Sequence, residues 1–479
     1  MQQTLFFYDL ETSGLDARTD RIMQFAGQRT NLQLEPLGEP VNLLVKLPDD
    51  TLPSPYAINV TKITPQSTQQ DGLTEAELCR YLQDEIFTPQ TVALGYNTVR
   101  FDDEFIRHLF WRNFYDPYEW QWADGRSRWD LLDVVRLTRA LRPEGIEWPF
   151  TPEGKPTNRL ELLTKLNGIS HEHAHDALSD VYATIAVAKL IKEKQPQLYD
   201  FLFKARDKRE VQKLVNLDHK KPFVYASGRY SNEFNKATVA FPIAPGRNGR
   251  VLVYDLRYNL DSELATLETV PREGYDPSEA SEPRNDGRER EWSKKLPRAI
   301  VKELAYNRCP AVAPMGVLEA HDGWRKIGLT PDQVQANLKS LLAHPEFAER
   351  MRTENENKPE WPAAVDSESA LYDAFLPDQD RITCNMIHNA TANQLADLHP
   401  NFLDERLPEL LLHYKARNFA TALSESEVQQ WEQYRQARLQ RQQPSFVAAM
   451  EKLSADPATD DFVLTELQLW YQSLASTDY

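Results

Sequence analysis

Residues 4–14 read TLFFYDLETSG, an apolar and aromatic run that ends in two carboxylates and a turn. The run predicts a short buried strand over residues 4–8. Asp9 and Glu11 follow two positions apart, and the period of two in an extended chain places both side chains on one face. We therefore expect the first strand to present a pair of carboxylates at its C-terminal end.

The segments after this strand alternate between strand and helix patterns. Short apolar runs predict strands at residues 22–29, 41–46 and 91–96, and helical spacing predicts helices at residues 74–87, 101–114 and 176–192. The first three strands suggest an antiparallel start to a sheet, and the alternation indicates an α/β domain. In the last helix we expect the apolar side chains to face the core, namely Leu178, Val181, Tyr182, Ile185 and Leu190.

The chain of 479 residues exceeds what one hydrophobic core usually supports, so several domains are expected. Short β-rich runs separated by Gly, Pro and Asn fill residues 213–315. Residues 352–362 have a linker composition, and residues 367–479 carry helical segments without good strands. We predict three domains: an α/β domain at residues 1–195, a β-rich domain at 196–350 and an all-helical domain at 351–479.

Composition limits the binding partners and the cellular compartment that the protein can have. The formal net charge of −17 would on average repel the phosphates of nucleic acid, so binding would need a local basic track. The N-terminus has no basic start, and no stretch approaches the roughly 20 apolar residues of a spanning helix. The three cysteines are too few and too scattered for a disulfide framework or a zinc ribbon. We expect a cytoplasmic protein without a membrane segment.

Two further motifs carry groups suited to catalysis. NTVRFDDEF places Asp102 at or near a helix start, and HAHDALSDVYAT places His175 just before a helix with Asp180 about one turn into it. Singly, each motif has a structural explanation, as a strand terminus, a helix N-terminus or a capping histidine. Together, the carboxylates suit two divalent cations roughly 3.5–4 Å apart that activate water and stabilise a leaving oxygen. A neutral histidine could take the proton of that water, because its reference pKa of about 6.5 lies near working pH.

Residues 108–143 form the most aromatic and basic stretch of the chain. Aromatic rings stack on unpaired bases and arginines neutralise phosphates, so this composition suits a groove for a single strand. The candidate rings are Tyr115, Tyr118, Trp120, Trp122 and Trp129, and the alternative is that they fill the core. Arg136, Arg139 and Arg142 recur every three residues and predict a cationic stripe, for which the alternative is a solvated helix face.

The ordered set Asp9-x-Glu11, Asn97 to Asp102 and His175 to Asp180 resembles the three motifs of the DEDDh exonuclease superfamily. LGYNTVRFDDEF, RNFYDPY, SRWDLLDVVR, ALRPEGIEWP, RLELLTKLNGI, AHDALSDVYATIA and YKARNF resemble bacterial exonuclease I over nearly the whole chain. The resemblance implies a ribonuclease H-like nuclease domain, an SH3-like β domain and a helical domain. The first motif, DLETSG, departs from that family because it reads more like the general proofreading form.

The resemblance also implies processive 3′-to-5′ hydrolysis of single-stranded DNA to 5′-mononucleotides, in repair and recombination. It implies two Mg²⁺ ions, with Mn²⁺ as a substitute, on Asp9, Glu11, Asp102 and Asp180, and His175 as the base. Glu11 and Arg159 would contact the substrate, and the path of the strand would be lined by Arg107, Tyr118, Trp122, Arg136 and Arg142. The family binds the acidic C-terminal tail of single-strand DNA-binding protein, for which the sequence offers Lys220 and Lys221, or Arg325 and Lys326, without assigning a pocket. We expect a monomer.

Two other functions stay open at this point. An RNA-directed or proofreading relative would share the same five residues, although such relatives are usually shorter, single-domain chains. A catalytically idle DNA-binding or scaffolding protein is disfavoured because all five catalytic residue types are present.

Overall fold

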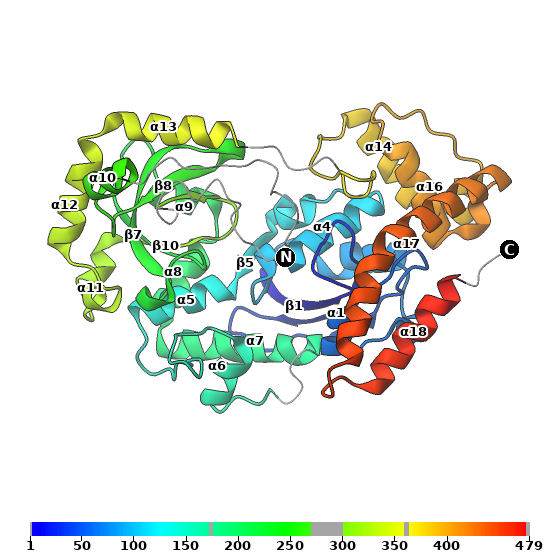
Figure 1. Cartoon of the computed structure of the whole chain (residues 1–479), viewed down its shortest axis with the longest axis horizontal. Helices are drawn as coiled ribbons and strands as arrows, with labels where there is room; N and C mark the ends of the chain where they lie inside the picture. Colours follow the sequence, from blue (N-terminus) through cyan, green and yellow to red (C-terminus); the bar gives the residue numbers. More distant parts are fainter. Residues whose placement is uncertain (1, 172–175, 270–299, 359–363, 476–479) are drawn as a thin grey trace. The chain divides into compact units, whose positions relative to one another are not determined.

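The computed structural model describes residues 2–171, 176–269, 300–358 and 364–475 (Figure 1). The chain divides into two compact units. Unit 1 comprises Met1–Arg128, His171–Tyr182 and Pro362–Tyr479, and unit 2 comprises Trp129–Ser170 and Ala183–Trp361.

The first sheet is mixed and has the strand order β3-β2-β1-β4-β5. Its strands are β1 (Thr4–Thr12), β2 (Ile22–Thr30), β3 (Val41–Leu44), β4 (Thr91–Gly95) and β5 (Ser127–Asp130). β1 pairs antiparallel with β2 and parallel with β4, and β2 pairs antiparallel with β3, as the expected antiparallel start requires. β1 continues to Thr12 instead of ending at residue 8, so Asp9 and Glu11 lie within the strand. The register shifts between Glu11 and Thr12, which marks a bulge beside the two carboxylates.

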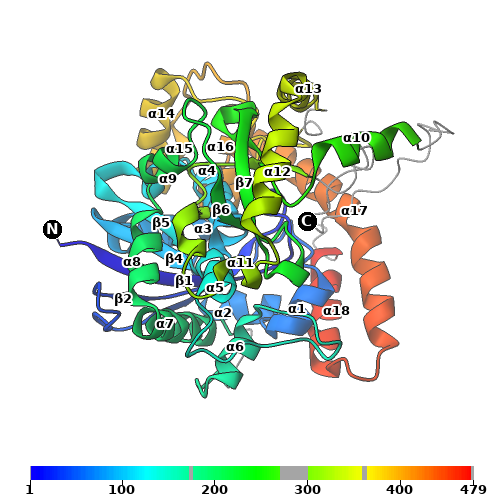
Figure 2. The same ribbon diagram turned by 90° about the vertical axis from the view of Figure 1, so that its left-hand side faces the viewer.

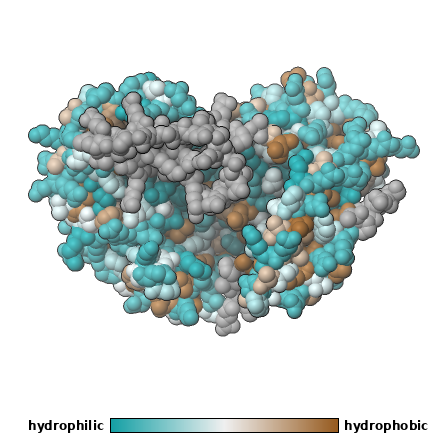
Figure 3. Space-filling model, in the orientation of Figure 1, coloured by the Kyte–Doolittle hydropathy of each residue, from teal (hydrophilic) through white to brown (hydrophobic). Residues whose placement is uncertain are grey.

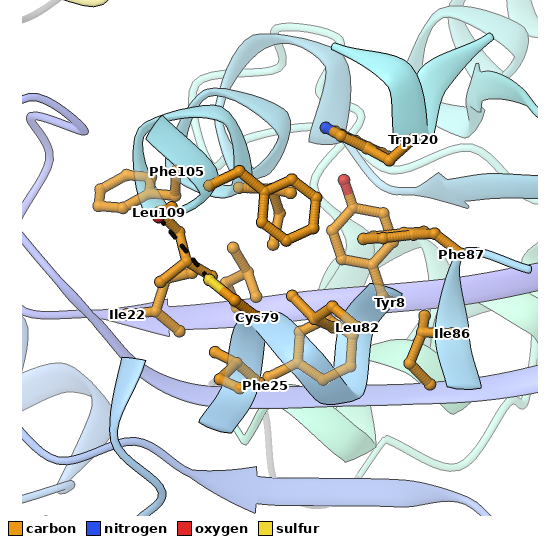
Figure 4. Packing of buried hydrophobic residues seen from close by; sticks show 14 of the residues in the cluster. Tyr8, Ile22, Phe25, Cys79, Leu82, Ile86, Phe87, Phe105, Leu109 and Trp120 are labelled. Atoms are coloured by element: carbon orange, nitrogen blue, oxygen red, sulfur yellow. Dashed lines mark hydrogen bonds between the residues drawn. The ribbon is translucent and has the colours of Figure 1, made fainter. Parts of the chain in front are cut away.

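One hydrophobic core of unit 1 lies between this sheet and the helices α3 (Glu75–Tyr81) and α4 (Asp102–Arg112). Figure 4 shows Tyr8 and Phe25 of the strands facing Cys79, Phe105 and Leu109 of these helices. Two of the proposed stacking rings belong to this core, since Tyr115 is 9% exposed and Trp120 is 1% exposed. Trp129 is buried as well, with its ring against Tyr199 and Phe203. The prediction that these three rings stack on bases is therefore wrong, because their faces are covered by other side chains.

A second, antiparallel sheet with the order β10-β6-β7-β8-β9 confirms the β-rich region of unit 2. Its strands are β6 (Phe223–Ala226), β7 (Ala237–Pro245), β8 (Val251–Asp255), β9 (Val301–Leu304) and β10 (Ala311–Pro314). The helix α5 (Leu131–Leu141) contacts β6, β7 and β10, and α13 (Pro345–Glu356) lies against β7 (Figure 2). Other helices of this unit among the described residues are α6 (Leu160–Leu166), α8 (Pro196–Lys204), α9 (Lys208–Leu214), α10 (Leu260–Thr269), α11 (Gly323–Lys326) and α12 (Pro331–Leu342).

Helix α7 (Ala177–Lys194) begins close to its predicted start. Val181 and Ile185 are buried as expected, and Leu178 and Leu190 are partly buried. Tyr182 is 45% exposed, so the prediction that it faces the core is wrong. Tyr182 follows Val181 directly, and one helical step of about 100° turns its ring away from the buried stripe.

The C-terminal region between residues 364 and 475 is helical and holds no strand, as expected. Its helices are α14 (Asp378–His388), α15 (Ala392–Ala396), α16 (Leu407–Asn418), α17 (Glu425–Ser454) and α18 (Asp461–Ala475). One core joins these helices to Trp111 and Phe114, and another joins them to Met23 and Leu52. The helices α17 and α18 lie beside α1 (Pro55–Thr61) and α2 (Pro65–Asp71) (Figures 1 and 2). The N-terminal elements from β1 to α4 and the C-terminal helices therefore pack together within unit 1.

Over the described residues, no helix is long and apolar enough to cross a membrane. The face drawn in Figure 3 is largely hydrophilic, with apolar residues scattered over it.

Candidate active site

A cluster of carboxylates lies at the end of β1, the central strand of the first sheet. Asp9 and Glu11 of β1 and Asp180 of α7 each offer an oxygen, and these oxygens lie within 4.8 Å of one another. All three side chains are partly buried. Residues separated by about 170 positions therefore meet at one point, and they come from the strand and the helix that the pattern predicted.

Asp102 is the first residue of α4 and adjoins this cluster. Its Oδ1 accepts a hydrogen bond of 3.1 Å from the backbone N–H of Leu10, the residue between Asp9 and Glu11. A carboxylate at a helix N-terminus is stabilised by the helix dipole. The negative charge of Asp102 in turn contributes to the raised pKa of Asp9. Asp102 is thus an electrostatic neighbour of the cluster, although its oxygens are outside the group of three.

The start of α7 is held against the sheet by Gln24 of β2, which pairs with Glu11 across the strands. Gln24 Nε2 donates to Asp176 Oδ1 at 3.3 Å, and its Oε1 accepts from Ala177 N at 3.4 Å. Since Asp180 lies one turn beyond Asp176, these bonds aim the Asp180 side chain toward β1.

His175, the predicted base, lies outside the described residues. A different histidine contacts the cluster: His171 Nε2 is 2.5 Å from Asp180 Oδ1, and the His171 side chain is 4% exposed. Sequence reasoning missed His171 because motif spacing drew attention to His175 alone. The alternation of histidines in SHEHAHD, residues 170–176, was the available signal.

The electrostatics of the cluster favour a bound cation. Burial raises the pKa of Glu11 to about 9, and the charges of Asp9, Asp180 and Asp176 add to the rise. Burial likewise raises the pKa of Asp9 well above its usual range, together with the charges of Asp102, Asp180 and Asp176. Carboxylates that repel one another in a partly buried site are relieved by protons or by a divalent cation. The oxygen-only ligand set matches Mg²⁺, so the residues present fit that ion.

A buried network links the two elements that carry Asp9 and Asp102. The Tyr8 hydroxyl donates to Asp103 Oδ1, and the Arg128 guanidinium donates to Asp103 Oδ2. Tyr8 and Asp103 are each 1% exposed. Tyr8 precedes Asp9 in the sequence, and Asp103 follows Asp102. The contact between Tyr8 and Asp103 therefore fixes the position of β1 relative to the start of α4.

Four of the residues proposed to contact DNA lie in unit 1, namely Glu11 of the carboxylate cluster, Arg107, Tyr118 and Trp122. Trp122 is 65% exposed and leaves a ring face open to a base. Arg107 is 6% exposed, donates to Glu104 Oε1 at 2.8 Å and to Gln121 Oε1 at 2.7 Å, and lies 5.8 Å from the Tyr118 ring. The charge of Arg107 is therefore shared with protein groups, whereas Trp122 is the more accessible of these candidates.

The other candidates, Arg136, Arg142 and Arg159, lie in unit 2. Arg136 Nη1 is 2.6 Å from Asp133 Oδ1, and Arg142 Nη2 donates to Val317 O at 3.1 Å. Arg159 is exposed and pairs with Glu161. Arg139 is 4% exposed and donates to the carbonyls of Thr157 and Pro149, so its place in an exposed cationic stripe is wrong. Its guanidinium satisfies loop carbonyls instead of facing solvent.

Comparison with known families gives a match to three family models in succession. The model described as "Exonuclease" matches residues 6–188, "Exonuclease I SH3-like domain" matches residues 206–354, and "Exonuclease I C-terminal domain" matches residues 365–474. Together with the two sheets and the helical region, these matches confirm the predicted fold class.

Several known proteins are similar to this chain over nearly its full length. The chain is 37% identical to exodeoxyribonuclease I of Haemophilus influenzae over 98% of both chains, and 38% identical to exodeoxyribonuclease I of Escherichia coli over 91% of this chain and 89% of that protein. Structures of Escherichia coli exonuclease I are similar at 34% identity over 99% of this chain and 100% of theirs. They include a complex with a dA16 oligonucleotide (TM-score 0.89) and a zinc-bound complex with single-stranded DNA (TM-score 0.87). A structure described as SSB/Exonuclease I in complex with an inhibitor is similar at the same identity and coverage, with a TM-score of 0.85.

Proposed function

Because the chain belongs to the exonuclease I family and is a hydrolytic exonuclease, we propose that it degrades single-stranded DNA. It removes nucleotides processively from the 3′ end, releases 5′-mononucleotides and acts in repair and recombination. The observation that carries this proposal is the meeting of Asp9, Glu11 and Asp180 within 4.8 Å, in a chain similar over its length to exodeoxyribonucleases I. The full-length similarity, which includes residues 206–474, favours this substrate over RNA, and the carboxylate cluster disfavours an idle scaffold.

Asp9, Glu11, Asp102 and Asp180 hold two Mg²⁺ ions in this proposal, with Mn²⁺ as a substitute. The oxygen-only donors and the raised pKa values of Asp9 and Glu11 support it, as does the zinc-bound structure of the Escherichia coli relative. When bound, the ions would lower the pKa of a coordinated water and balance charge on the phosphate. The carboxylates of β1, α4 and α7 would orient the scissile phosphodiester against the end of the sheet.

His175 is the proposed general base, five residues before Asp180 in the sequence. A neutral imidazole there would accept the proton of the attacking water, for which a pKa near working pH is suited. His171, bonded to Asp180, lies beside the carboxylates instead. Mutation of each histidine separately would distinguish the two roles.

The bases of the DNA strand would stack on Trp122, whose exposed ring supports this role. Glu11 and Arg159 would contact the substrate near the scissile phosphate. Arg107, Tyr118, Arg136 and Arg142 would line the rest of its path. The dA16 complex of the Escherichia coli relative is consistent with a single-stranded ligand.

We also propose that the chain binds the acidic C-terminal tail of single-strand DNA-binding protein, in line with the solved complex of that protein with exonuclease I. Lys220 and Lys221 are exposed basic side chains suited to this role, whereas Arg325 is exposed but pairs with Asp322 at 3.1 Å, and Lys326 pairs with Glu144. We further propose that the protein is a cytoplasmic monomer. Its proposed domains are residues 1–195, 196–350 and 351–479.

The experiment that tests the function is digestion of one oligonucleotide labelled at either end, with Mg²⁺ or with EDTA. A 3′ label should appear at once as a mononucleotide, a 5′ label should stay on shortening strands, and EDTA should stop both. RNA of the same sequence serves as a competitor, and Asp378→Ala, an exposed acid in the first turn of α14, is the control for Asp180→Ala. Early release of the 5′ label, or equal digestion of RNA, would contradict the proposal.

A further inference from the structure

The loop that follows the two carboxylates of β1 is closed by Arg21. Ser13 N donates to Arg21 O at 2.8 Å, and Arg21 N donates to Ser13 Oγ at 2.9 Å. The Arg21 side chain is 0% exposed. Since the loop begins at the residue after Thr12, its position determines where β1 ends and therefore where Glu11 lies.

The buried guanidinium of Arg21 meets a carboxylate of the C-terminal region. Arg21 Nη2 is 2.5 Å from Glu368 Oε2, a contact between residues 347 positions apart. Glu368 is 0% exposed, and its Oε1 also receives His413 Nδ1 at 2.9 Å and the guanidinium of Arg417. Burial alone would raise the pKa of Glu368, but Arg417, Arg21 and His413 hold it well below its usual range.

An arginine of the C-terminal helices also contacts this loop directly. Arg438 of α17 donates from Nη2 to the carbonyl of Thr19 at 2.7 Å. Its Nε is 3.0 Å from Asp50 Oδ2, and Asp50 also pairs with Arg417 at 2.6 Å. From the other side, Ser54 N donates to Ser13 O at 2.6 Å. All these groups belong to unit 1.

We propose that Glu368 is a positioning residue for the nuclease site, through which the C-terminal helical region holds the loop after β1 and so keeps Asp9 and Glu11 in place. The proposal deepens the proposed function and rests on it for the identity of the metal ligands. A buried ion pair is weak evidence for stability, since apolar replacements of similar volume are often neutral. Burying the charges of Arg21 and Glu368 costs desolvation energy, so stability alone does not account for this ion pair. The charge-assisted hydrogen bonds between them have fixed directions and can therefore define the geometry of the loop.

The test is Glu368→Gln in the full-length protein, an isosteric change that removes the negative charge. A displacement near 1 Å at a catalytic site costs up to about 10²-fold in rate, so we expect kcat to fall about 10- to 100-fold while KM for an oligonucleotide changes less than about twofold. Mn²⁺ binding without DNA, followed by electron paramagnetic resonance, should weaken about tenfold. Hydrogen exchange at the amides of Ser13 and Arg21 should become faster.

Asp380→Asn is the matched control, because Asp380 is also 0% exposed and lies in the C-terminal region but binds the amides of Leu403 and Asp404. It should lower the melting temperature without changing kcat, Mn²⁺ affinity or exchange in the loop. If Glu368→Gln has the same profile as Asp380→Asn, Glu368 only stabilises the fold and the proposal is overturned.

Arg21→Lys provides the second variant if Glu368→Gln does not fold, because lysine keeps the charge but loses the fork that reaches Glu368 and the loop carbonyl of Thr19. It should show the same pattern to a smaller degree, and wild-type Mn²⁺ affinity with normal kcat would overturn the proposal. The Mn²⁺ and exchange measurements need no DNA. A wild-type protein inactive on single-stranded DNA would therefore refute the proposed function without deciding the role of Glu368.

Discussion

Metal binding should release protons and strengthen as pH rises, because the carboxylates of the site hold protons in the absence of a cation. The pKa of Glu11 is raised to about 9 by burial and by the charges of Asp9, Asp180 and Asp176. Glu11 must lose its proton to bind a cation, which costs about 2.7 kcal/mol at pH 7 and about 1.4 kcal/mol at pH 8. We therefore expect the dissociation constant for Mg²⁺ to fall about tenfold between pH 7 and pH 8.

The raised pKa of Glu11 also makes the folding stability of the metal-free protein depend on pH. Glu11 has an ordinary value of 4.5 in the unfolded chain and about 9 in the folded, metal-free protein, so the folded state binds the extra proton between these values. The metal-free protein should be most stable at the low end of this window and should lose stability as pH rises toward about 9. Added Mg²⁺ should oppose this loss, with a larger rise in melting temperature at pH 8 than at pH 6.

Isothermal titration calorimetry measures this release directly, when Mg²⁺ is titrated into the metal-free protein in two buffers of different ionisation enthalpy. At pH 7 the difference between the buffers should correspond to about one proton or more per molecule. Glu11→Gln should reduce the number released, and Glu161→Gln, at a glutamate that pairs with Arg159 in unit 2, is the control. Binding that is independent of pH and releases no proton would refute the reasoning about the raised pKa.

The remaining predictions concern single side chains. Asp180→Ala should abolish hydrolysis yet keep the melting temperature within a few degrees, because it removes a ligand and no core volume; retained Mg²⁺-dependent turnover would disprove its role. His175→Ala should lower kcat by about 10²- to 10⁴-fold and alter the pH–rate profile, and an unchanged profile would exclude it as the base. Trp122→Ala should weaken binding of single-stranded DNA by about 1–3 kcal/mol, measured by fluorescence anisotropy with an oligonucleotide, with little change in stability. Trp120→Ala should instead destabilise the fold by about 3–5 kcal/mol in denaturant unfolding, so equal effects of the two substitutions on binding would argue against stacking on Trp122.

Much of the fold was predictable because its signals are local. The period of two in residues 4–14 placed Asp9 and Glu11 on one face, and the helix pattern placed Asp180 in the first turns of α7. The change to short β runs and then to helices indicated a β-rich region followed by a helical region, and the family models for the SH3-like and C-terminal domains match these regions. These features depend on neighbours within a few residues, which the sequence shows directly.

Which side chains are accessible could not be predicted in this way. Trp120 and Trp122 stand two positions apart in one aromatic segment, yet they are 1% and 65% exposed. Arg139 has the same spacing as Arg136 and Arg142 but is buried against loop carbonyls. Composition and spacing predict the same exposure for every tryptophan or arginine of such a segment. They do not show which side chains the fold packs against each one.

The sequence by itself determined the identity and order of the carboxylates, the elements that carry them and the family. Only the tertiary structure decided that Gln24 ties α7 to β2, that His171 reaches Asp180, and that Glu368 meets Arg21 across 347 positions. The physical reason is the separation along the sequence of the residues that interact. Secondary structure follows from interactions between residues only a few positions apart. A buried charge, in contrast, is stable only beside partners that the folded chain supplies from anywhere along its length.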